Sequence, residues 1–168
     1  MVNDVTAEVR SNLGCELNEA LAALAALPKY FKSATLSAAI GDVSEELVAR
    51  HTKAKRKKRG SAYDLIGPKE ERIEAKSRFQ APDRGRGPES LQFNFKQSKK
   101  SAQVAFCLYW VADEGAPPRL EQVFRVSVDE LIRRWRQSKT SKYCARTTLK
   151  KLRDAAQESK GLPSTKRR

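Results

Sequence analysis

The sequence predicts an α/β fold in which a mixed central sheet of about five strands is flanked by helices. Apolar residues recur at helical spacing near both ends of the chain, whereas the middle contains short segments in which apolar and polar residues alternate. The 168 residues suit one domain with a sizeable buried core. We therefore expect a single domain over residues 1–160 and a disordered basic tail at 161–168.

Two amphipathic helices are expected in the N-terminal part of the chain, residues 1–52. The first covers residues 5 to 27, where valine and leucine recur every three or four positions until Pro28, which cannot continue the helix. The second runs from about residue 33 to about residue 50 and has a similar apolar stripe on one side.

Strands are expected in the middle of the chain, on either side of a turn-rich loop at 79–90. The segment 103–111 is apolar at nearly every position, which indicates a strand buried on both faces. The other strands are expected at about 61–66, 71–77, 91–95 and 122–126.

Two helices follow the last of these strands. Ser127 is expected to cap the first, because Glu130 stands three residues later and completes a capping box. The final helix is expected over residues 145–157. We expect the basic face of the helix at 127–137 and the basic stretch at 139–153 to be solvated, and a second DNA-contacting surface is the alternative.

The charge of the chain indicates a polyanionic partner. Thirty-four Lys and Arg against 20 Asp and Glu give a formal net charge of +14, so nucleic acid is the first candidate. No apolar run is long enough to span a membrane, and a membrane partner is not expected. Cys15, Cys107 and Cys144 lack a CxxC spacing, which favours the cytoplasm and small buried thiols over disulfides or zinc. A single histidine, His51, argues against histidine-based metal sites and a Ser-His-Asp triad.

Three charged residues of the first expected hairpin form the candidate site. Strand alternation places Glu74 and Lys76 on the same face, and the hairpin can bring Asp64 opposite them. Two neighbouring carboxylates repel each other unless a divalent cation lies between them, and hard oxygen ligands suit Mg²⁺. The lysine could then orient or deprotonate a water, or stabilise charge on a phosphate. The alternative is a solvated face of an edge hairpin.

The spacing of these residues resembles that of the PD-(D/E)XK nuclease superfamily. Its members have an Asp at the end of one strand and Glu/Asp-x-Lys on the next; here Asp64 is followed, after nine residues, by Glu74-Ala75-Lys76. The segment "GDVSEELVARHTKAKRKKRGSAYDLIG" looks like the helix and loop before the catalytic hairpin of such enzymes. The match covers a catalytic core at about residues 36 to 137 and implies a restriction-endonuclease-like fold.

The resemblance implies a Mg²⁺-dependent endonuclease that cleaves both strands of DNA at specific sequences, as restriction or homing enzymes do. Asp64 and Glu74 would be the metal ligands and Lys76 the catalytic lysine. Glu45 would be the glutamate of the preceding helix, because Gly41-x-x-x-Glu45 matches that pattern, and Glu46 is the alternative. Double-stranded DNA is the expected partner, and cutting two strands favours a homodimer or higher homo-oligomer. A non-catalytic DNA-binding protein and a nuclease for branched DNA or RNA are the other possibilities.

Cations and amides around this site are the expected DNA contacts. The run 53–59 lies just before the site, and the glycine-rich loop after it contains two arginines, the residue type that most often contacts guanine. A solvated surface loop is the alternative for both segments, and a nuclear-import-like signal is another for the run. Two amides of the strand at 91–95 share one face, which could line the cleft or merely face water. The expected contacts are Lys53, Lys55, Arg56, Lys57, Lys58, Arg59, Arg78, Arg84, Arg86, Gln92 and Asn94.

Overall fold

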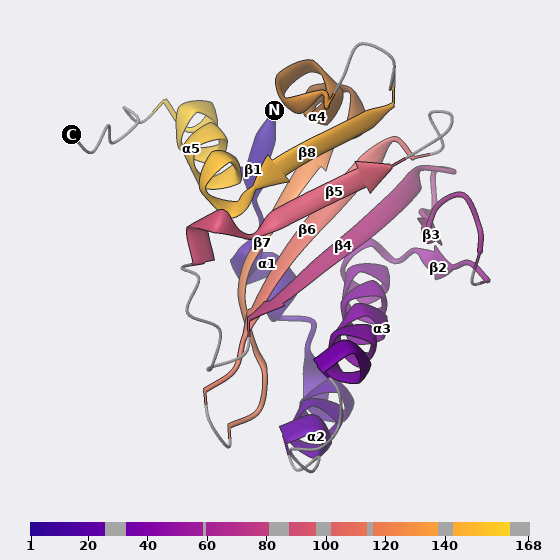
Figure 1. Ribbon diagram of the computed structural model, residues 1–168. Helices are drawn as coiled ribbons and strands as arrows, with labels where there is room; N and C mark the ends of the chain where they lie inside the picture. Colours follow the sequence, from indigo (N-terminus) through magenta and orange to yellow (C-terminus); the bar gives the residue numbers. More distant parts are fainter. Residues whose placement is uncertain are drawn as a thin grey trace.

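The computed structural model describes residues 1–25, 33–58, 60–80, 88–96, 102–113, 116–137 and 143–161 (Figure 1). Within these ranges the fold is mixed α/β, with five helices and a central sheet of six strands in the order β1-β7-β6-β4-β3-β2. β4 and β6 are parallel, and the other neighbours are antiparallel. The strands of this sheet are β1 (Val2–Asp4), β2 (Lys55–Arg56), β3 (Leu65–Ile66), β4 (Arg72–Gln80), β6 (Val104–Val111) and β7 (Arg119–Ser127).

The N-terminal segment differs from the prediction of one helix over residues 5 to 27. The chain first forms β1, which pairs with β7, and then two helices, α1 (Thr6–Arg10) and α2 (Gly14–Ala25). Gly14 adopts a φ of +62°, a left-handed conformation that interrupts helical geometry. The apolar residues of both helices nevertheless pack into the same core, so the periodicity was right and the continuity was wrong. Pro28 lies outside the described residues.

Helix α3 (Ser33–Thr52) covers one face of the sheet, as Figure 1 shows. Its Ile40 and Leu47 are fully buried against residues of β4 and β6. The indole Nε1 of Trp110 donates to the Ser44 hydroxyl, 2.9 Å away, and joins the helix to the sheet inside this core. The helix ends where Lys53 adopts a left-handed φ of +56°, a frequent conformation just past a helix C-terminus.

The opposite face of the sheet is covered by α4 (Val128–Trp135), α5 (Leu149–Ser159) and a second, two-stranded sheet of β5 (Gln92–Lys96) and β8 (Cys144–Thr148). The strand expected at 91–95 therefore exists, but it does not join the central sheet. The predicted final helix at 145–157 is wrong at its start, since residues 144–148 pair with β5. The helix begins only after Thr148, whose hydroxyl accepts from the Lys151 N–H.

Several other predictions can be compared directly with the structure. The buried strand is confirmed as β6, and Ser127 accepts the expected capping bond from the Glu130 N–H at 3.2 Å. Cys107 is buried, as expected, but Cys144 is half-buried and Cys15 is exposed, contrary to the expectation of small buried residues. Among the described residues, no helix has the length and apolar character that a membrane crossing requires.

Candidate functional site

The Asp64 side chain lies where the short strand β3 begins. The strand expected at 61–66 contains only two paired residues, and Asp64 stands just before them. Its main-chain N–H donates to the Ile73 carbonyl at 3.0 Å, and its Oδ2 accepts from the Ala75 N–H at 2.8 Å. The carboxylate is thus anchored to the main chain of β4 between Glu74 and Lys76.

Glu74 and Lys76 lie on the face of β4 that points away from α3. Their neighbours Ile73 and Ala75 belong to the core beneath α3, as strand alternation predicts. The Lys76 ammonium forms an ion pair with Glu74 Oε1. The Glu74 side chain is only 12% exposed and that of Lys76 33%, so the lysine extends from a mostly buried carboxylate toward solvent.

The electrostatics of Asp64 are unfavourable for an ionised carboxylate. Burial raises its pKa, and the nearby negative charge of Glu74 raises it further. The hydrogen bond from Ala75 and the positive charges of Lys76 and Arg56 act in the opposite direction but do not fully compensate. An additional cation placed beside Asp64 would therefore stabilise the ionised form of its carboxylate.

Two residues of this site could hold a Mg²⁺ ion. Asp64 and Glu74 supply hard carboxylate oxygens, and a cation beside Asp64 would oppose the burial and the negative charge of Glu74 that raise its pKa. Over the described ranges, no three or more His, Cys, Asp or Glu side chains are grouped so that they could hold a metal. Two carboxylates suffice for Mg²⁺, which commonly completes its shell with water and substrate phosphate oxygens.

Arg56 links the acidic face of α3 to the site. Its Nη2 donates to Glu45 Oε2 at 2.9 Å and to Asp42 Oδ1 at 3.3 Å, and its charge lowers the pKa of Asp64. Glu46 accepts from Arg50 Nε at 3.1 Å, and its Oε2 lies 3.9 Å from Arg56 Nη1. Arg56 therefore pairs with both candidate glutamates and is hydrogen-bonded to Glu45.

The sequence assigned Arg56 only to DNA contact and did not anticipate this carboxylate-binding role. Asp42 and Glu45 are three residues apart on α3, so their side chains share a face and can hold one cation. That spacing was the available signal. The position of Arg56 beside Asp64 depends on the pairing of β2 with β3, which was not predicted.

The other lysines of the basic run remain in solvent next to the site. Lys53, Lys55, Lys57 and Lys58 are exposed, and none has a carboxylate partner within the described part of the chain. The Lys57 N–H donates to the Asp64 carbonyl at 2.8 Å, which fixes the run beside that residue. The predicted contacts Arg59, Arg84 and Arg86 lie outside the described residues.

The remaining predicted contacts lie along β4 and β5. Arg78 is on the same face of β4 as Lys76, two residues further on, and its Nε donates to the Gln92 carbonyl at 2.5 Å. Gln92 is exposed, and Asn94 is half-buried with its Oδ1 bonded to Arg146. These residues extend the polar face of the site from β4 onto the second sheet.

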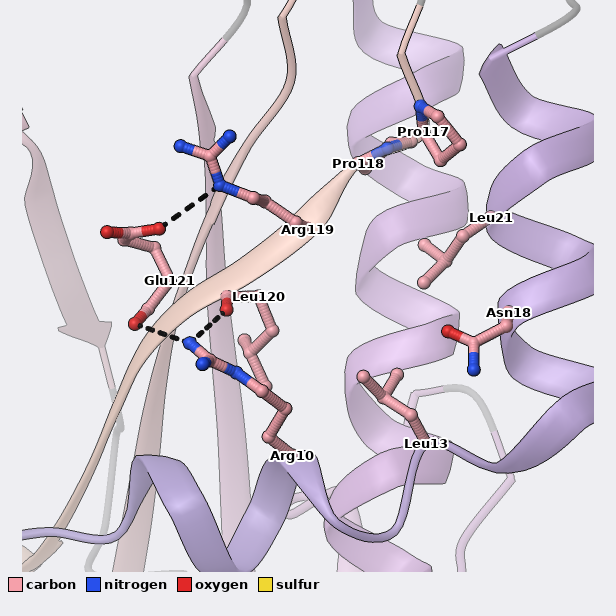
Figure 2. A pocket seen from close by; sticks show the side chains of 9 residues that line it. All are labelled: Arg10, Leu13, Asn18, Leu21, Pro117, Pro118, Arg119, Leu120 and Glu121. Carbon is pink, nitrogen blue, oxygen red and sulfur yellow. Dashed lines mark hydrogen bonds and ion pairs between the residues drawn. The ribbon is translucent and has the colours of Figure 1, made fainter.

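A separate pocket of about 420 Å³ lies between α1, α2 and the start of β7 (Figure 2). Leucine and proline side chains form much of its wall. Arg10 donates to the carbonyls of Leu120 and Glu121, and Arg119 pairs with the Glu121 carboxylate. None of the candidate site residues lines it, and its arginines are already engaged.

Neither a scan against protein-family models nor a search of curated proteins finds a match for this chain. The function proposed below therefore rests on the geometry of the site and the charge of the chain.

Proposed function

We propose that this protein is a Mg²⁺-dependent endonuclease that hydrolyses phosphodiester bonds in double-stranded DNA and has a restriction-endonuclease-like core. The observation that carries the proposal is the hydrogen bond from the Ala75 N–H to Asp64 Oδ2. It holds Asp64 against the strand that bears Glu74 and Lys76, and the net charge of +14 favours a polyanionic substrate.

Each residue of the site has a distinct role in this proposal. Asp64 and Glu74 would hold the metal, which when bound supplies Lewis-acid stabilisation of charge on the phosphate. Glu74 also orients the Lys76 ammonium through their ion pair. Lys76 then presents its N–H groups to the attacking water or to a phosphate oxygen and stabilises negative charge there. Arg56 lowers the pKa of Asp64 by its positive charge and also binds Glu45.

Cutting both strands of a duplex requires two such sites, so we propose a homodimer or higher homo-oligomer on DNA. Sedimentation of the protein with and without a duplex tests this point. A monomeric complex that nicks one strand only would contradict it.

The decisive experiment measures cleavage of supercoiled plasmid DNA with Mg²⁺ or with EDTA. Glu74→Gln and Lys76→Met should each lower the rate by about a hundredfold or more, because each removes a charge required at the reacting phosphate. Lys69→Met is the matched control: Lys69 is an exposed lysine in the turn of the same hairpin, and its loss should leave the rate unchanged. Equal, metal-independent rates for all proteins would refute the enzyme.

One observation favours a second candidate, a DNA-binding protein without catalysis. Lys76 already neutralises Glu74, and no third acidic ligand joins the pair within the described ranges. Duplex binding without cleavage in Mg²⁺ or Mn²⁺ would support this candidate. Preferential cleavage of branched DNA or of RNA would redirect the proposal to another nucleic-acid substrate.

A further inference from the structure

Two arginines flank strand β5 and bind it only through neutral oxygens. Arg78, on β4, donates from Nε to the Gln92 carbonyl at 2.5 Å and from Nη1 to its neighbouring Ser77 carbonyl at 3.3 Å. Arg146, on β8, donates from Nε to Asn94 Oδ1 at 3.0 Å. Neither has a carboxylate partner among the residues that the structure describes. Their positive charges are therefore not neutralised within that part of the chain.

Most other arginines of the described chain are neutralised by acidic neighbours. Arg10 and Arg153 also bind neutral groups, but those groups lie on β7 and not beside β5. Because Arg78 and Arg146 have no such acidic neighbour among the described residues, the β5 region has a local excess of positive charge. Ion pairs with Asp or Glu are formed by Arg50, Arg56, Arg119, Arg125, Arg133 and Arg134.

Strand β5 has one free edge, and that edge faces β4. The Leu91 carbonyl accepts from the Leu149 N–H, so the carbonyl of the next residue, Gln92, points away from β8. Arg78 of β4 binds this carbonyl, which places β5 alongside β4, the strand that contains Glu74 and Lys76. Figure 1 shows β4, β5 and β8 in succession across this face of the molecule.

The outer face of the second sheet opens toward the same side as the candidate site. Phe93 and Phe95 of β5 are buried between the two sheets, so the alternate residues Asn94 and Arg146, which are paired across the strands, point outward. Glu74 also points from β4 toward the side on which the second sheet is packed. A strand of nucleic acid that reaches the site can therefore continue over β5 and β8.

We propose that Arg78, Gln92, Asn94 and Arg146 form a phosphate-binding strip that carries the nucleic-acid backbone from Lys76 across β5 to β8. Each arginine is fixed through Nε by a neutral oxygen. Within the described ranges no partner occupies the terminal nitrogens of Arg146, which can therefore make the bidentate contact that guanidinium groups form with phosphates. Arg146 is the new positioning residue. Its role at a cleavage site rests on the proposed function, whereas its binding role can be measured without cleavage.

The test measures binding of the full-length chain to a short fluorescein-labelled duplex by anisotropy, in EDTA and on a Lys76→Met background. Adding Arg146→Ala should weaken binding severalfold and lower the slope of log K against log salt by about 1 between about 50 and 200 mM NaCl. Arg146→Lys should restore the slope, because it restores the charge, and only part of the affinity. A change confined to folding would not alter the slope in this way.

Arg119→Ala is the matched control, because Arg119 is also an exposed strand arginine but is paired with Asp113 and Glu121. The proposal is overturned if Arg146→Ala has the same affinity and slope as this control, or if the parent protein does not bind the duplex. Plasmid cleavage by the parent with unchanged binding by Arg146→Ala would leave the nuclease standing and remove the strip. Binding that depends on Arg146, with no plasmid cleavage by the parent, would support the strip and refute the nuclease.

Discussion

Asp64→Asn should show that the Asp64 charge lowers the stability of the fold while it is required for the proposed activity. The asparagine oxygen can accept the same bond from the Ala75 N–H, whereas the negative charge that burial and Glu74 disfavour is removed. We expect the variant to be as stable as the parent or more stable at neutral pH, and to lack the proposed nuclease activity. A gain in stability on losing a charge is a frequent property of functional sites.

Comparison with Asp64→Ala measures how much the hydrogen bond from the Ala75 N–H contributes to stability. Alanine removes both the charge and the hydrogen-bond acceptor, whereas asparagine removes only the charge. Leaving the Ala75 N–H without its partner should cost about 1 to 3 kcal/mol relative to Asp64→Asn. With a urea m value of about 2 kcal/mol/M, this corresponds to a difference of roughly 0.5 to 1.5 M between the unfolding midpoints of the two variants. Urea unfolding followed by circular dichroism measures both midpoints, and equal m values confirm that the comparison is valid.

The pH dependence of the free energy of unfolding tests the direction of this effect. The pKa of Asp64 is raised in the folded protein, so its ionisation lowers stability as the pH rises through that value. The advantage of Asp64→Asn should therefore be present at neutral pH and disappear below about pH 4. Asp4→Asn is the control, because the Asp4 carboxylate accepts two hydrogen bonds from Thr6 and should gain nothing on neutralisation. An Asp64→Asn variant less stable than the parent by more than about 1 kcal/mol at neutral pH would refute the reasoning.

Two further predictions concern stability away from the site. Bonds from Arg133 and Arg134 lower the pKa of Glu130 to about 2, so Glu130→Gln should cost about 1 to 2 kcal/mol above about pH 4.5 and progressively less toward pH 2, measured by thermal unfolding. A cost independent of pH would contradict the ion pairs. Ser44→Ala leaves the buried Trp110 N–H without its acceptor and should cost about 1 to 3 kcal/mol. The same change in a Trp110→Phe background should cost clearly less, and an equal cost would show that the bond contributes nothing.

Periodicity predicted the elements whose burial follows a simple pattern. The apolar segment 103–111 forms the central strand β6, and the stripe on residues 33–50 lies on α3. The pattern did not predict β1, which has only three residues, or β8, which directly precedes a helix. Their strand conformation comes from pairing with distant partners, β7 and β5. Residues 145–148 continue directly into α5, and the predicted helix at 145–157 therefore included them.

The sequence by itself determined the residue types and local spacing of the candidate site. Alternation alone put Glu74 and Lys76 on one face, because side chains along a strand point to opposite sides in turn. Only the tertiary structure decided what surrounds them. The Asp64 carboxylate binds the Ala75 N–H, Arg56 stands between α3 and Asp64, and Arg146 lies across β5 from Arg78. These contacts join different elements of the fold, so their geometry depends on how β2, β3, β5 and β8 pair and pack, which no local pattern specifies.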